Sequence, residues 1–527
     1  MIEIPSSKER RAVTKTNVPL ADRALLLRPD DDVAVTTREL ASGTTALTAT
    51  DDLVLSSDVP RSHKPAVRPV SAGDAVHGCS QTIGRATADI AAGEHVHSPN
   101  LGMDVTERAY EFGTGRTRLT ASAADTARTF QRYHRENGKI GTRNFIGVPT
   151  LVNCSASSAT MVADQFCGFA LEAFENVDGV VAITHQSARG LVPGSEAANA
   201  LVRTLMGYAQ HPNFGCLLVL GLGCEMVPVR SLVDGPSLPT GTIVHTLTIQ
   251  DAGGVGATLR AGAERIKEML PKLDQRCRAL APISELVLGV NCGCSDDFSG
   301  ITANPALGHA SDRLVATGGT SILAEAPEVS RRRAPAHPPC GLRGRRSLPA
   351  RPDQVEAGTR AGRRRHARQQ PVARQQVRRA EDDPGEVSRR RRQGRPGPLT
   401  AVYEYAESVT DRGFVLVDTP GYAPVAVTGI VAGGANVVCF TTGRGSVLGC
   451  RPTPSIKLAT NNEMVDRMAE EMDINCGHIV DGTATLTDVG DETFERIIAD
   501  ASGGRTISEE LDLGQDEFIP SQLGTVT

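Results

Sequence analysis

The sequence has no tryptophan, and aromatic residues make up only 3% of its 527 positions, so aliphatic side chains must pack its cores. No run approaches the ~20 consecutive apolar residues that a membrane-spanning helix needs, so no membrane partner is expected. The opening M-I-E-I-P-S-S-K-E-R-R lacks the apolar segment of a secretory signal peptide, which favours a cytoplasmic location. The 12 cysteines do not form a regular framework of spacings, so reduced thiols or ligands are expected rather than disulfides.

The chain is too long for a single core, so several domains are expected. Short strands separated by the turns A-S-G-T, S-A-G-D and A-A-G-E predict a compact β domain, and later strands that alternate with helices predict parallel α/β domains of the Rossmann-like kind. The predicted divisions are a tail (1–23), the β domain (24–105), a polar linker (106–127), a central α/β domain (128–330), an arginine-rich segment (331–396) and a C-terminal α/β domain (397–527).

Polar residues follow several predicted strands of the α/β region. Cys154 follows the strand 146–152, His185 follows the strand 180–184, and Cys292 and Asp296 follow the strand 286–290. Active sites of parallel sheets lie at the carboxyl ends of their strands, so these four residues are the catalytic candidates, with His185 as base or acid. The alternatives are a histidine that only caps its strand and cysteines that only pack in a core.

The stretch from Gly433 to Asn461 is rich in glycine and hydroxyl groups. A buried strand (437–440) runs into T-T-G-R-G, a turn whose hydroxyls and backbone N–H groups predict a cradle for an anion. A carboxylate of a substrate is the expected ligand, although a turn that serves only packing is the alternative. The candidate substrate-binding residues are Thr441, Thr442, Arg444, Ser455, Lys457 and Asn304.

Three histidines in the β domain form a candidate metal site. His95 and His97 alternate on one strand and therefore share a face, and His63 lies on a nearby turn. Imidazoles in this number suit a divalent ion, with Fe²⁺ or Mn²⁺ expected first and Ca²⁺ or Mg²⁺ as alternatives. An iron–sulfur cluster is the rival cofactor, but the sequence has no C-x₂-C-x₂-C spacing.

The segment 331–396 differs from the rest of the chain in composition. It holds 20 arginines, no lysine and six acidic residues, a net charge of +14 in a chain whose total is −5. One interpretation is a basic arm that associates with nucleic acid through charge alone, because the segment has no aromatic residue for stacking.

Several longer motifs resemble the altronate/galactarate dehydratase family. They are N-G-K-I-G-T-R-N (137–144), H-P-N-F (211–214), G-L-G-C-E (221–225), S-G-I-T-A-N-P-A-L-G (299–308), D-T-P-G-Y (418–422), V-A-G-G-A-N (431–436) and M-D-I-N-C-G (472–477). The resemblance implies a β-clip (SAF-like) first domain, in which R-S-H-K (61–64) stands where the family has G-H-K. It also implies dehydration of a sugar acid. The first expectation is conversion of altronate to 2-dehydro-3-deoxy-D-gluconate, and the alternative substrate is galactarate or another hexarate. We expect the enzyme to be a homodimer.

The chain departs from the family pattern in two places. Q-S-A-R-G (186–190) stands where the family has G-T-G-C-G, and C-G-C-S-D (292–296) stands where it has C-G-G-S-D. The first change removes a cysteine, at Arg189, so the resemblance assigns that position no thiol chemistry.

The resemblance favours a second interpretation of the arginine-rich segment. Residues 369–377, Q-Q-P-V-A-R-Q-Q-V, can be encoded as CAA CAA CCC GTC GCC CGG CAA CAA GTC, which one base later reads N-N-P-S-P-G-N-K. That peptide resembles the N-P-S-P-G-N-K loop of the family, and the same offset converts residues 331–340 and 377–387 into family-like peptides. A displaced reading frame therefore accounts for the segment and predicts an enzyme whose activity is impaired.

Overall fold

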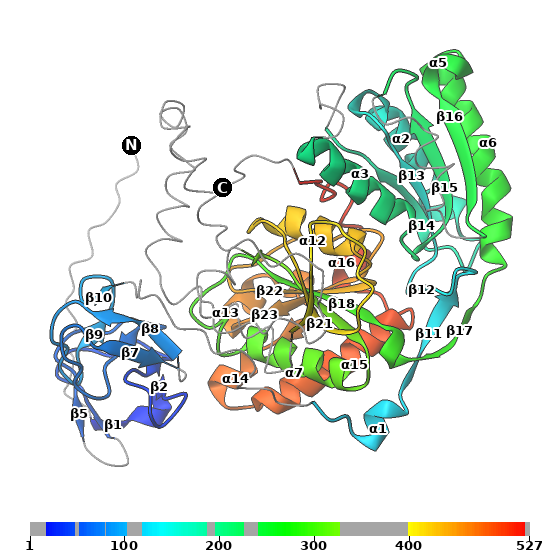
Figure 1. Ribbon diagram of the computed structural model, residues 1–527. Coiled ribbons are helices and arrows are strands. Elements are labelled where there is room, and N and C mark those ends of the chain that lie inside the picture. Colours follow the sequence, from blue (N-terminus) through cyan, green and yellow to red (C-terminus); the bar gives the residue numbers. More distant parts are fainter. Residues whose placement is uncertain are drawn as a thin grey trace, which may run out of the picture. The chain divides into compact units, whose positions relative to one another are not determined.

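The computed structural model describes residues 17–47, 52–78, 81–102, 119–186, 195–225, 241–326 and 399–521 (Figure 1). Contacts divide the chain into a small N-terminal unit, described over residues 17–102, and a large unit, described over residues 119–521. The predicted arginine-rich segment (331–396) and the departure at Arg189 lie outside the described residues.

The small unit is built from short strands around two aliphatic cores, as the turn pattern predicts. Its sheets have the strand orders β1-β4-β5, β10-β8-β7, β2-β3 and β6-β9. The bounds are β1 (Asn17–Pro19), β2 (Ala24–Leu25), β3 (Val35–Thr36), β4 (Thr45–Leu47), β5 (Leu53–Val54), β6 (Lys64–Pro65), β7 (Ala75–Gly78), β8 (Gln81–Ala86), β9 (His95–Val96) and β10 (Leu101–Gly102), with a 3₁₀ turn at Leu20–Asp22. The first strand begins before the predicted start at residue 24.

The three predicted turns of this unit repeat one local structure. Gly43, Gly73 and Gly93 occupy the third position of A-S-G-T, S-A-G-D and A-A-G-E, and all three have positive φ, 80°, 87° and 84°. Glycine adopts this conformation without the steric cost that a Cβ imposes. At Gly93 a Cβ would also lie 2.0 Å from the carbonyl oxygen of Val54, so the close approach of two strands excludes any side chain there.

The first sheet of the large unit is parallel and has the order β14-β13-β15-β16. Its strands are β13 (Phe145–Pro149), β14 (Gly179–Ile183), β15 (Phe214–Gly221) and β16 (Ile243–Thr248). Helices α2 (Ala156–Ala163) and α6 (Val255–Asp274) pack on one face and α3 (Glu196–Ala209) packs on the other. A short helix α5 (Ile249–Ala252) precedes α6, and 3₁₀ turns span Asn153–Ser155, Asp164–Phe166 and Gly168–Ala170.

The second sheet has seven parallel strands in the order β20-β21-β19-β18-β22-β23-β24. They are β18 (Val287–Cys292), β19 (Thr320–Leu323), β20 (Leu399–Tyr403), β21 (Gly413–Val417), β22 (Val437–Thr442), β23 (Ser455–Ala459) and β24 (Ile474–Asn475). The associated helices are α7 (Ala303–Ala316), α12 (Ala423–Ala432), α13 (Asn462–Arg467), α14 (His478–Asp481), α15 (Leu486–Ala501) and α16 (Ile507–Glu510), with 3₁₀ turns at Ile283–Glu285 and Ala469–Glu471.

The strands of this sheet place the domain boundary before β18, and not at residue 330 as the sequence predicts. β18 and β19 belong to the predicted central domain, but they pair with β22 and β21 of the predicted C-terminal domain. Buried parallel strands are apolar along their whole length, so their composition does not reveal which sheet they join. The two sheets are joined through the segment around β17 (Arg278–Pro282), which pairs with β11 (Thr129–His134) in a small sheet completed by β12 (Ile140–Gly141).

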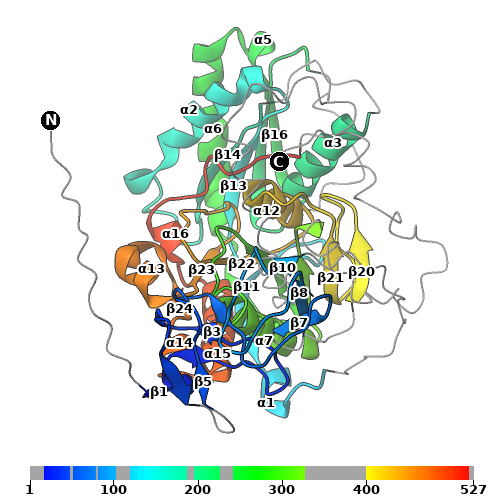
Figure 2. The same cartoon turned by 90° about the vertical axis from the view of Figure 1, so that its left-hand side faces the viewer.

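Alternating side chains of β22 show how the layers of the large unit are stacked. Val437 and Cys439 face a core formed with α7 and α15, whereas Val438 and Phe440 face a core shared with α12 and α3. Figures 1 and 2 show α12 on one side of the seven-stranded sheet and α7 and α15 on the other. The pair α3 and α12 therefore forms the layer between the two sheets.

The carboxyl ends of both sheets lie on the same side of the large unit. Each of α3 and α12 starts after the carboxyl end of a strand and runs back to an amino end. Their C-terminal ends touch, since a Cβ at Gly207 would lie 2.4 Å from the carbonyl oxygen of Ala432. One turn earlier in α3, Nε of Arg203 donates to the carbonyl oxygen of Tyr405 at 3.1 Å, and Tyr405 lies beyond the carboxyl end of β20. The two helices are thus parallel, and so are the two sheets.

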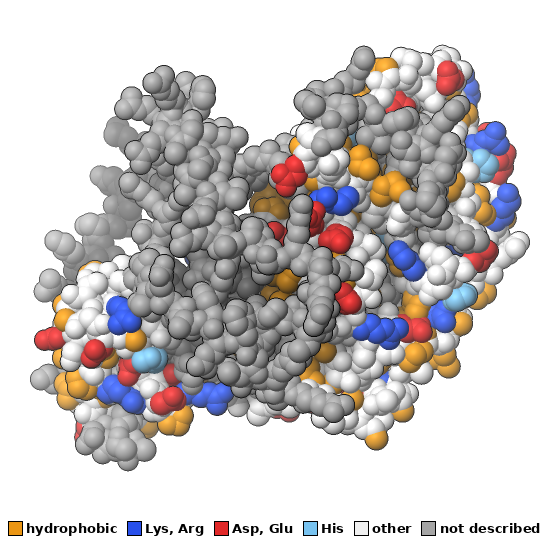
Figure 3. Space-filling view, in the orientation of Figure 1, with side chains coloured by type: hydrophobic (Ala, Val, Ile, Leu, Met, Phe, Trp, Pro, Cys, Tyr) orange, Lys and Arg blue, Asp and Glu red, His pale blue; other side chains and the backbone are white. Residues whose placement is uncertain are grey.

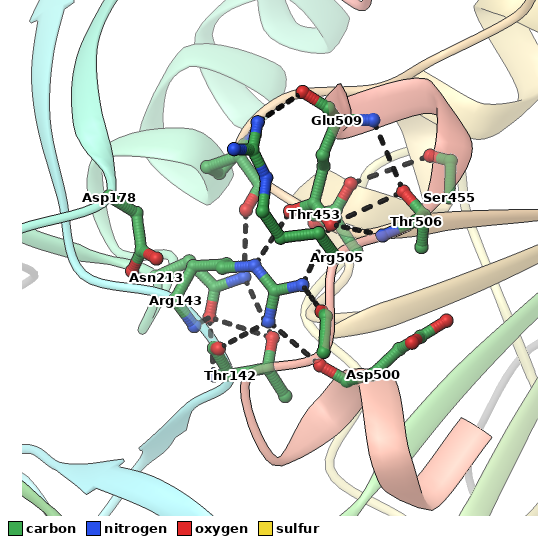
Figure 4. A network of polar contacts seen from close by, with 12 residues as sticks. Thr142, Arg143, Asp178, Asn213, Thr453, Ser455, Asp500, Arg505, Thr506 and Glu509 are labelled. Atoms are coloured by element: carbon green, nitrogen blue, oxygen red, sulfur yellow. Dashed lines mark hydrogen bonds and ion pairs between the residues drawn. The ribbon is translucent and has the colours of Figure 1, made fainter. Parts of the chain in front are cut away.

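A buried arginine ties the amino ends of these sheets to the C-terminal part of the chain (Figure 4). Arg143, just before β13, donates from Nε and Nη2 to the two carboxylate oxygens of Glu509 in α16, at 2.6 and 2.8 Å. Its remaining hydrogen bonds go to the carbonyl oxygens of Thr142, Asp500 and Gly504. A planar guanidinium with five donors is suited to this combination of a carboxylate and three carbonyls.

His211 makes a second contact between the two sheets. Its Nε2 donates to the carbonyl oxygen of Ala435 at 2.9 Å, and its Nδ1 accepts from the N–H of Asn213 at 3.2 Å. The neutral ring therefore satisfies both contacts, whereas a protonated ring would direct an N–H at another N–H. Burial lowers the pKa of His211 from 6.5 to about 4, with only partial opposition from the hydrogen bond to Ala435.

We expect replacement of His211 by Gln to reduce stability at pH 7 and to matter progressively less in acid. His211 is protonated below about pH 6.5 in the unfolded chain but only below about pH 4 in the folded chain. Between these two values the contribution of His211 to the free energy of unfolding therefore falls by about 3 kcal/mol as the pH is lowered. Urea midpoints followed by circular dichroism, since no tryptophan is present, measure the difference between parent and variant. The exposed His134, replaced in the same way, serves as the control. A difference that does not change with pH would contradict this assignment.

On the face shown in Figure 3, the described Lys and Arg side chains lie interspersed with Asp and Glu. In the part of the chain that the structure describes, no helix has both the length and the apolarity to cross a bilayer.

Candidate active site

A crevice is expected where the winding of the seven-stranded sheet reverses. The chain passes from β18 through α7 to β19 on one side of β18, whereas β22 lies on the other side. Loops that diverge at such a point leave an opening above the carboxyl ends of the strands. The loop after β18 contains Cys294 and Asp296, and the loop after β22 contains Gly443 and Arg444.

Asp296 holds these loops together. Its Oδ1 accepts hydrogen bonds from the N–H and Oγ of Ser299, at 2.8 and 2.7 Å, and from Oγ1 of Thr460 at 2.9 Å. Its Oδ2 accepts from Nδ2 of Asn461 at 2.8 Å. Four donors fix this carboxylate in place, so Asp296 anchors the two loops.

Gly443 is required because this carboxylate lies against it. A Cβ at position 443 would lie 2.3 Å from Cγ of Asp296. The glycine therefore serves close packing of two loops, a role that the sequence alone does not distinguish from anion binding.

The prediction that backbone N–H groups of this turn bind an anion is wrong. The N–H groups of Gly443 and Arg444 both donate to the carbonyl oxygen of Cys294 at 3.1 Å, and the N–H of Gly445 donates to Oγ1 of Thr442 at 3.2 Å. These donors are used within the protein. The side chain of Arg444, two residues past the end of β22, is exposed and supplies a cation at this edge of the sheet.

Thr441 and Asn304, two of the predicted substrate-binding residues, lie together at the start of α7, to which Asn304 belongs. Oγ1 of Thr441 donates to Oδ1 of Asn304 at 2.6 Å, and both side chains are buried. The amino end of this 14-residue helix has a partial positive charge that favours a nearby anion.

Ser455 and Lys457 are placed differently from the prediction. Both belong to β23 rather than to a loop, and Ser455 pairs in register with Val438, about 13 Å along the strand from Thr442. Ser455 is therefore not brought to the opening, and its hydroxyl donates to Thr453 O at 3.4 Å near the network of Figure 4. Lys457 is completely buried, its ammonium has no hydrogen-bond partner among the described residues, and burial lowers its pKa.

Cys154 and His185 lie at the carboxyl edge of the four-stranded sheet. Cys154 is exposed in the turn after β13, and His185 is buried after β14, where its carbonyl oxygen accepts from Nδ2 of Asn153 at 3.4 Å. Burial lowers the pKa of His185 and keeps the ring neutral. The predicted catalytic residues are thus divided between two sheets, with Cys292 and Asp296 on the other one.

The three histidines of the small unit are neighbours, as predicted. Nδ1 of His63 lies 2.8 Å from Nε2 of His95, and the rings of His95 and His97 stack with centroids 4.1 Å apart and planes inclined by 7°. Burial, followed by the nearby His97, His63 and Lys64, lowers the pKa of His95 to about 4.

This arrangement does not fit a metal ion. The lone pairs of stacked imidazoles lie in parallel planes and cannot converge on one point. Among the described residues, no group of three or more His, Cys, Asp or Glu side chains is arranged to hold a metal.

Two features of the opening were missed by sequence reasoning. Asn461, which also caps α13 through Met464 N, donates to Asp296 and to the carbonyl oxygen of Gly443. Glu325, two residues past β19, is buried beside Cys292. A helix-cap signal could have identified Asn461, but Glu325 follows a strand whose partners only the fold reveals.

Comparison with known proteins identifies the class to which this fold and site belong. Three family models match successive parts of the chain: the altronate/galactarate dehydratase SAF domain (residues 22–104), the D-galactarate dehydratase/altronate hydrolase second domain (132–274) and the D-galactarate/altronate dehydratase C-terminal domain (283–333 and 391–526). The small unit is therefore a SAF domain, and the family division after residue 274 agrees with the sheets.

Curated relatives extend along almost the whole chain. Altronate dehydratase of Escherichia coli is 30% identical over 503 residues, with 92% of this chain and 96% of the relative covered. Altronate dehydratase of Bacillus subtilis is 28% identical with the same coverage, and galactarate dehydratase (L-threo-forming) of E. coli is 31% identical over 88% of this chain and 90% of its own length. The protein is a carbon–oxygen lyase of the hydro-lyase class. It belongs to the D-galactarate/altronate dehydratase family of sugar-acid dehydratases.

Proposed function

We propose that this enzyme converts D-altronate to 2-dehydro-3-deoxy-D-gluconate and water, with galactarate or another hexarate as the alternative substrate. The observation that supports the proposal most is the meeting of the loops after β18 and β22 at the carboxyl edge of the sheet, where the exposed Arg444 and the start of α7 favour a carboxylate. The two altronate dehydratases among the relatives, each aligned over 92% of this chain, favour the hexonate.

The proposed reaction breaks two bonds of the substrate. A base takes the proton on C2, next to the carboxylate, and its electron pair forms the C2=C3 double bond. The C3–O bond breaks, and the departing hydroxyl takes a proton and leaves as water. The resulting enol loses its O–H proton and takes a proton at C3, which gives the 2-oxo acid, so that the net change is the loss of one water.

The residues of the opening would divide this work. Arg444 would pair with the substrate carboxylate, and Thr441 and Asn304 would orient it through hydrogen bonds. Asp296 would hold the loops after β18 and β22 together. His185 and Cys154, on the same side of the large unit but at the other sheet, remain candidates for proton transfer, and the buried Lys457 remains a candidate for charge stabilisation.

We expect 2-oxo acid to form from altronate, with slower formation from galactarate, when the purified chain is supplied with single hexonates and hexarates. Discontinuous measurement of the 2-oxo acid gives kcat/KM for each substrate. Parallel reactions with Fe²⁺, Mn²⁺, Mg²⁺ or a chelator test the divalent metal, which stays a prediction. The absence of product from every sugar acid, with every metal, both from this chain and from a chain in which the reading frame of residues 331–396 is restored, would refute the proposed function.

A further inference from the structure

The outer edge of β14 faces a cavity. β14 is the last strand of the four-stranded sheet, and among the described residues only β13 pairs with it. Consecutive residues of a strand point to opposite faces of a sheet, yet the four consecutive residues 179–182 all line one cavity of about 470 Å³. The cavity therefore meets the strand at its edge, where the backbone lies, and its volume is in the range of ligand-binding sites.

Two residues of β14 direct backbone groups at this cavity. The carbonyl oxygen of Ile183 accepts from the N–H of Thr150, the residue after β13, at 3.0 Å, so residue 183 and the alternate residues before it face β13. The N–H and C=O groups of Val180 and Ala182 consequently point away from β13. On that side neither residue forms a backbone hydrogen bond with the described part of the chain. A strand edge of this kind can pair with a further strand.

The opposite wall of the cavity comes from the C-terminal part of the chain. It contains residues 450–453 and Ser455, before and at the start of β23, and several residues between Arg505 and Asp516, in and after α16. Figure 4 labels residues of both walls, among them Asp178, which precedes β14, and Glu509 of α16. A strand of five residues is about 17 Å long, so this groove along β14 has the length of a short extended peptide.

The charged side chains that line the groove do not balance. The carboxylates are Asp164, Asp178, Glu509, Asp512 and Asp516, and the arginines are Arg143, Arg451 and Arg505. Five carboxylates against three arginines leave a net charge of −2. Arg143 pairs with Glu509 and Arg451 pairs with Asp512, so the excess is carried by the three other aspartates, which are all exposed.

Asp178 shows what this excess of negative charge does. Its Oδ2 accepts from the N–H of Asn144 at 2.5 Å, and its carboxylate forms no ion pair with a described residue. Asp178 is exposed to the groove, yet burial between the walls raises its pKa, and Arg143 and Arg278 oppose this only in part. A positive charge in the groove would stabilise the ionised carboxylate.

We propose that the groove along β14 binds an extended peptide with lysine or arginine side chains, which joins the four-stranded sheet as a fifth strand. Backbone groups of the peptide would bond to Val180 and Ala182, and its cations would face the unpaired aspartates. Asp296, Thr441 and Arg444 of the candidate active site do not line the groove, so the inference stands apart from the proposed function.

Calorimetric titration of the full chain with three blocked pentapeptides tests the proposal. The probe is Val-Lys-Val-Lys-Val, acetylated and amidated at its ends. In one control glutamate replaces lysine, and in the other every backbone nitrogen is methylated, which removes the hydrogen-bond donors. Each control should bind at least about 10-fold more weakly, the effect of losing one or two hydrogen bonds or ion pairs. Equal binding of either control, or no binding of the probe at about 1 mM, overturns the proposal.

Variants of the chain locate the bound peptide. Ala182→Pro removes an N–H that faces the groove and no bond to β13, a change that an edge strand tolerates, and it should abolish binding. Asp178→Asn should weaken binding about 3- to 10-fold, whereas its matched control Asp251→Asn, at an exposed aspartate of α5 outside the groove, should not. Circular dichroism establishes that each variant is folded. If Ala182→Pro does not fold, Asp178→Asn still decides, and unchanged affinity in either folded variant overturns the site.

Discussion

Restoring one reading frame across residues 331–396 is expected to raise the rate of sugar-acid dehydration by about 100-fold or more, the scale that a site loses with its positioning groups. The restored chain would contain N-N-P-S-P-G-N-K in place of Q-Q-P-V-A-R-Q-Q-V at 369–377. Steady-state kcat/KM of the two chains, purified in parallel and assayed with altronate, measures the effect.

The position of the segment in the fold explains why so large an effect is expected. β19 ends at Leu323, two residues before Glu325, and the next described strand of the same sheet is β20, which begins at Leu399. The family model for this domain matches up to residue 333 and again from residue 391, so the match is interrupted within the arginine-rich segment. Amide and ammonium donors of the restored peptide would join the sheet next to the proposed site.

A restored chain in which glycine and serine replace the N-P-S-P-G-N-K residues is the matched control, and it should be as slow as the chain with the arginine-rich segment. The DNA provides an independent check, because the offset frame must be open between two compensating one-base changes. Stop codons in that frame, or equal rates for both chains, would contradict the displaced frame and would favour a basic insertion that associates with nucleic acid.

Replacement of Arg143 by Ala is expected to destabilise the large unit by about 3–5 kcal/mol, the cost of breaking a buried ion pair by removing one partner. The side chain of Arg143 is 2% exposed and that of Glu509 is 17% exposed, and the variant removes the ion pair with Glu509 and the hydrogen bonds of the guanidinium to three carbonyl oxygens. Burial favours a raised pKa for Glu509, but the hydrogen bonds and charge of Arg143 outweigh it and lower the pKa. Urea unfolding at pH 7, followed by circular dichroism, measures the loss.

The ion pair between Arg128 and Glu495 provides the matched control. Its side chains are 36% and 50% exposed, and such pairs contribute about 0–1 kcal/mol. Arg128→Ala should therefore change the midpoint little. The double change Arg143→Met with Glu509→Leu should recover part of the stability, since an apolar pair leaves no buried charge. Equal effects of Arg143→Ala and Arg128→Ala would show that the buried network is not a main link between the sheets.

Local sequence patterns determined much of the secondary structure and the position of several candidate residues just after strands. The strand predicted at 180–184 is β14 (Gly179–Ile183), because a buried strand is apolar along its length and ends at a polar residue. The turns with Gly43, Gly73 and Gly93 and the neighbouring histidines of the small unit were also predictable, because backbone conformation and the period of a strand act over a few residues.

The sequence by itself also determined the family, since motifs such as N-G-K-I-G-T-R-N and S-G-I-T-A-N-P-A-L-G identify it without a structure. Tertiary structure alone decided how distant segments combine. β18 pairs with β22, and β19 pairs with β21, although the arginine-rich segment separates them in the sequence. Ser455 lies away from Arg444 because it is the first residue of β23. The N–H groups of Gly443 and Arg444 donate to the carbonyl oxygen of Cys294. Glu325 comes beside Cys292 in the same way. The physical reason is that strand pairing and the choice of hydrogen-bond partner depend on residues far apart in the chain, which composition and periodicity do not encode.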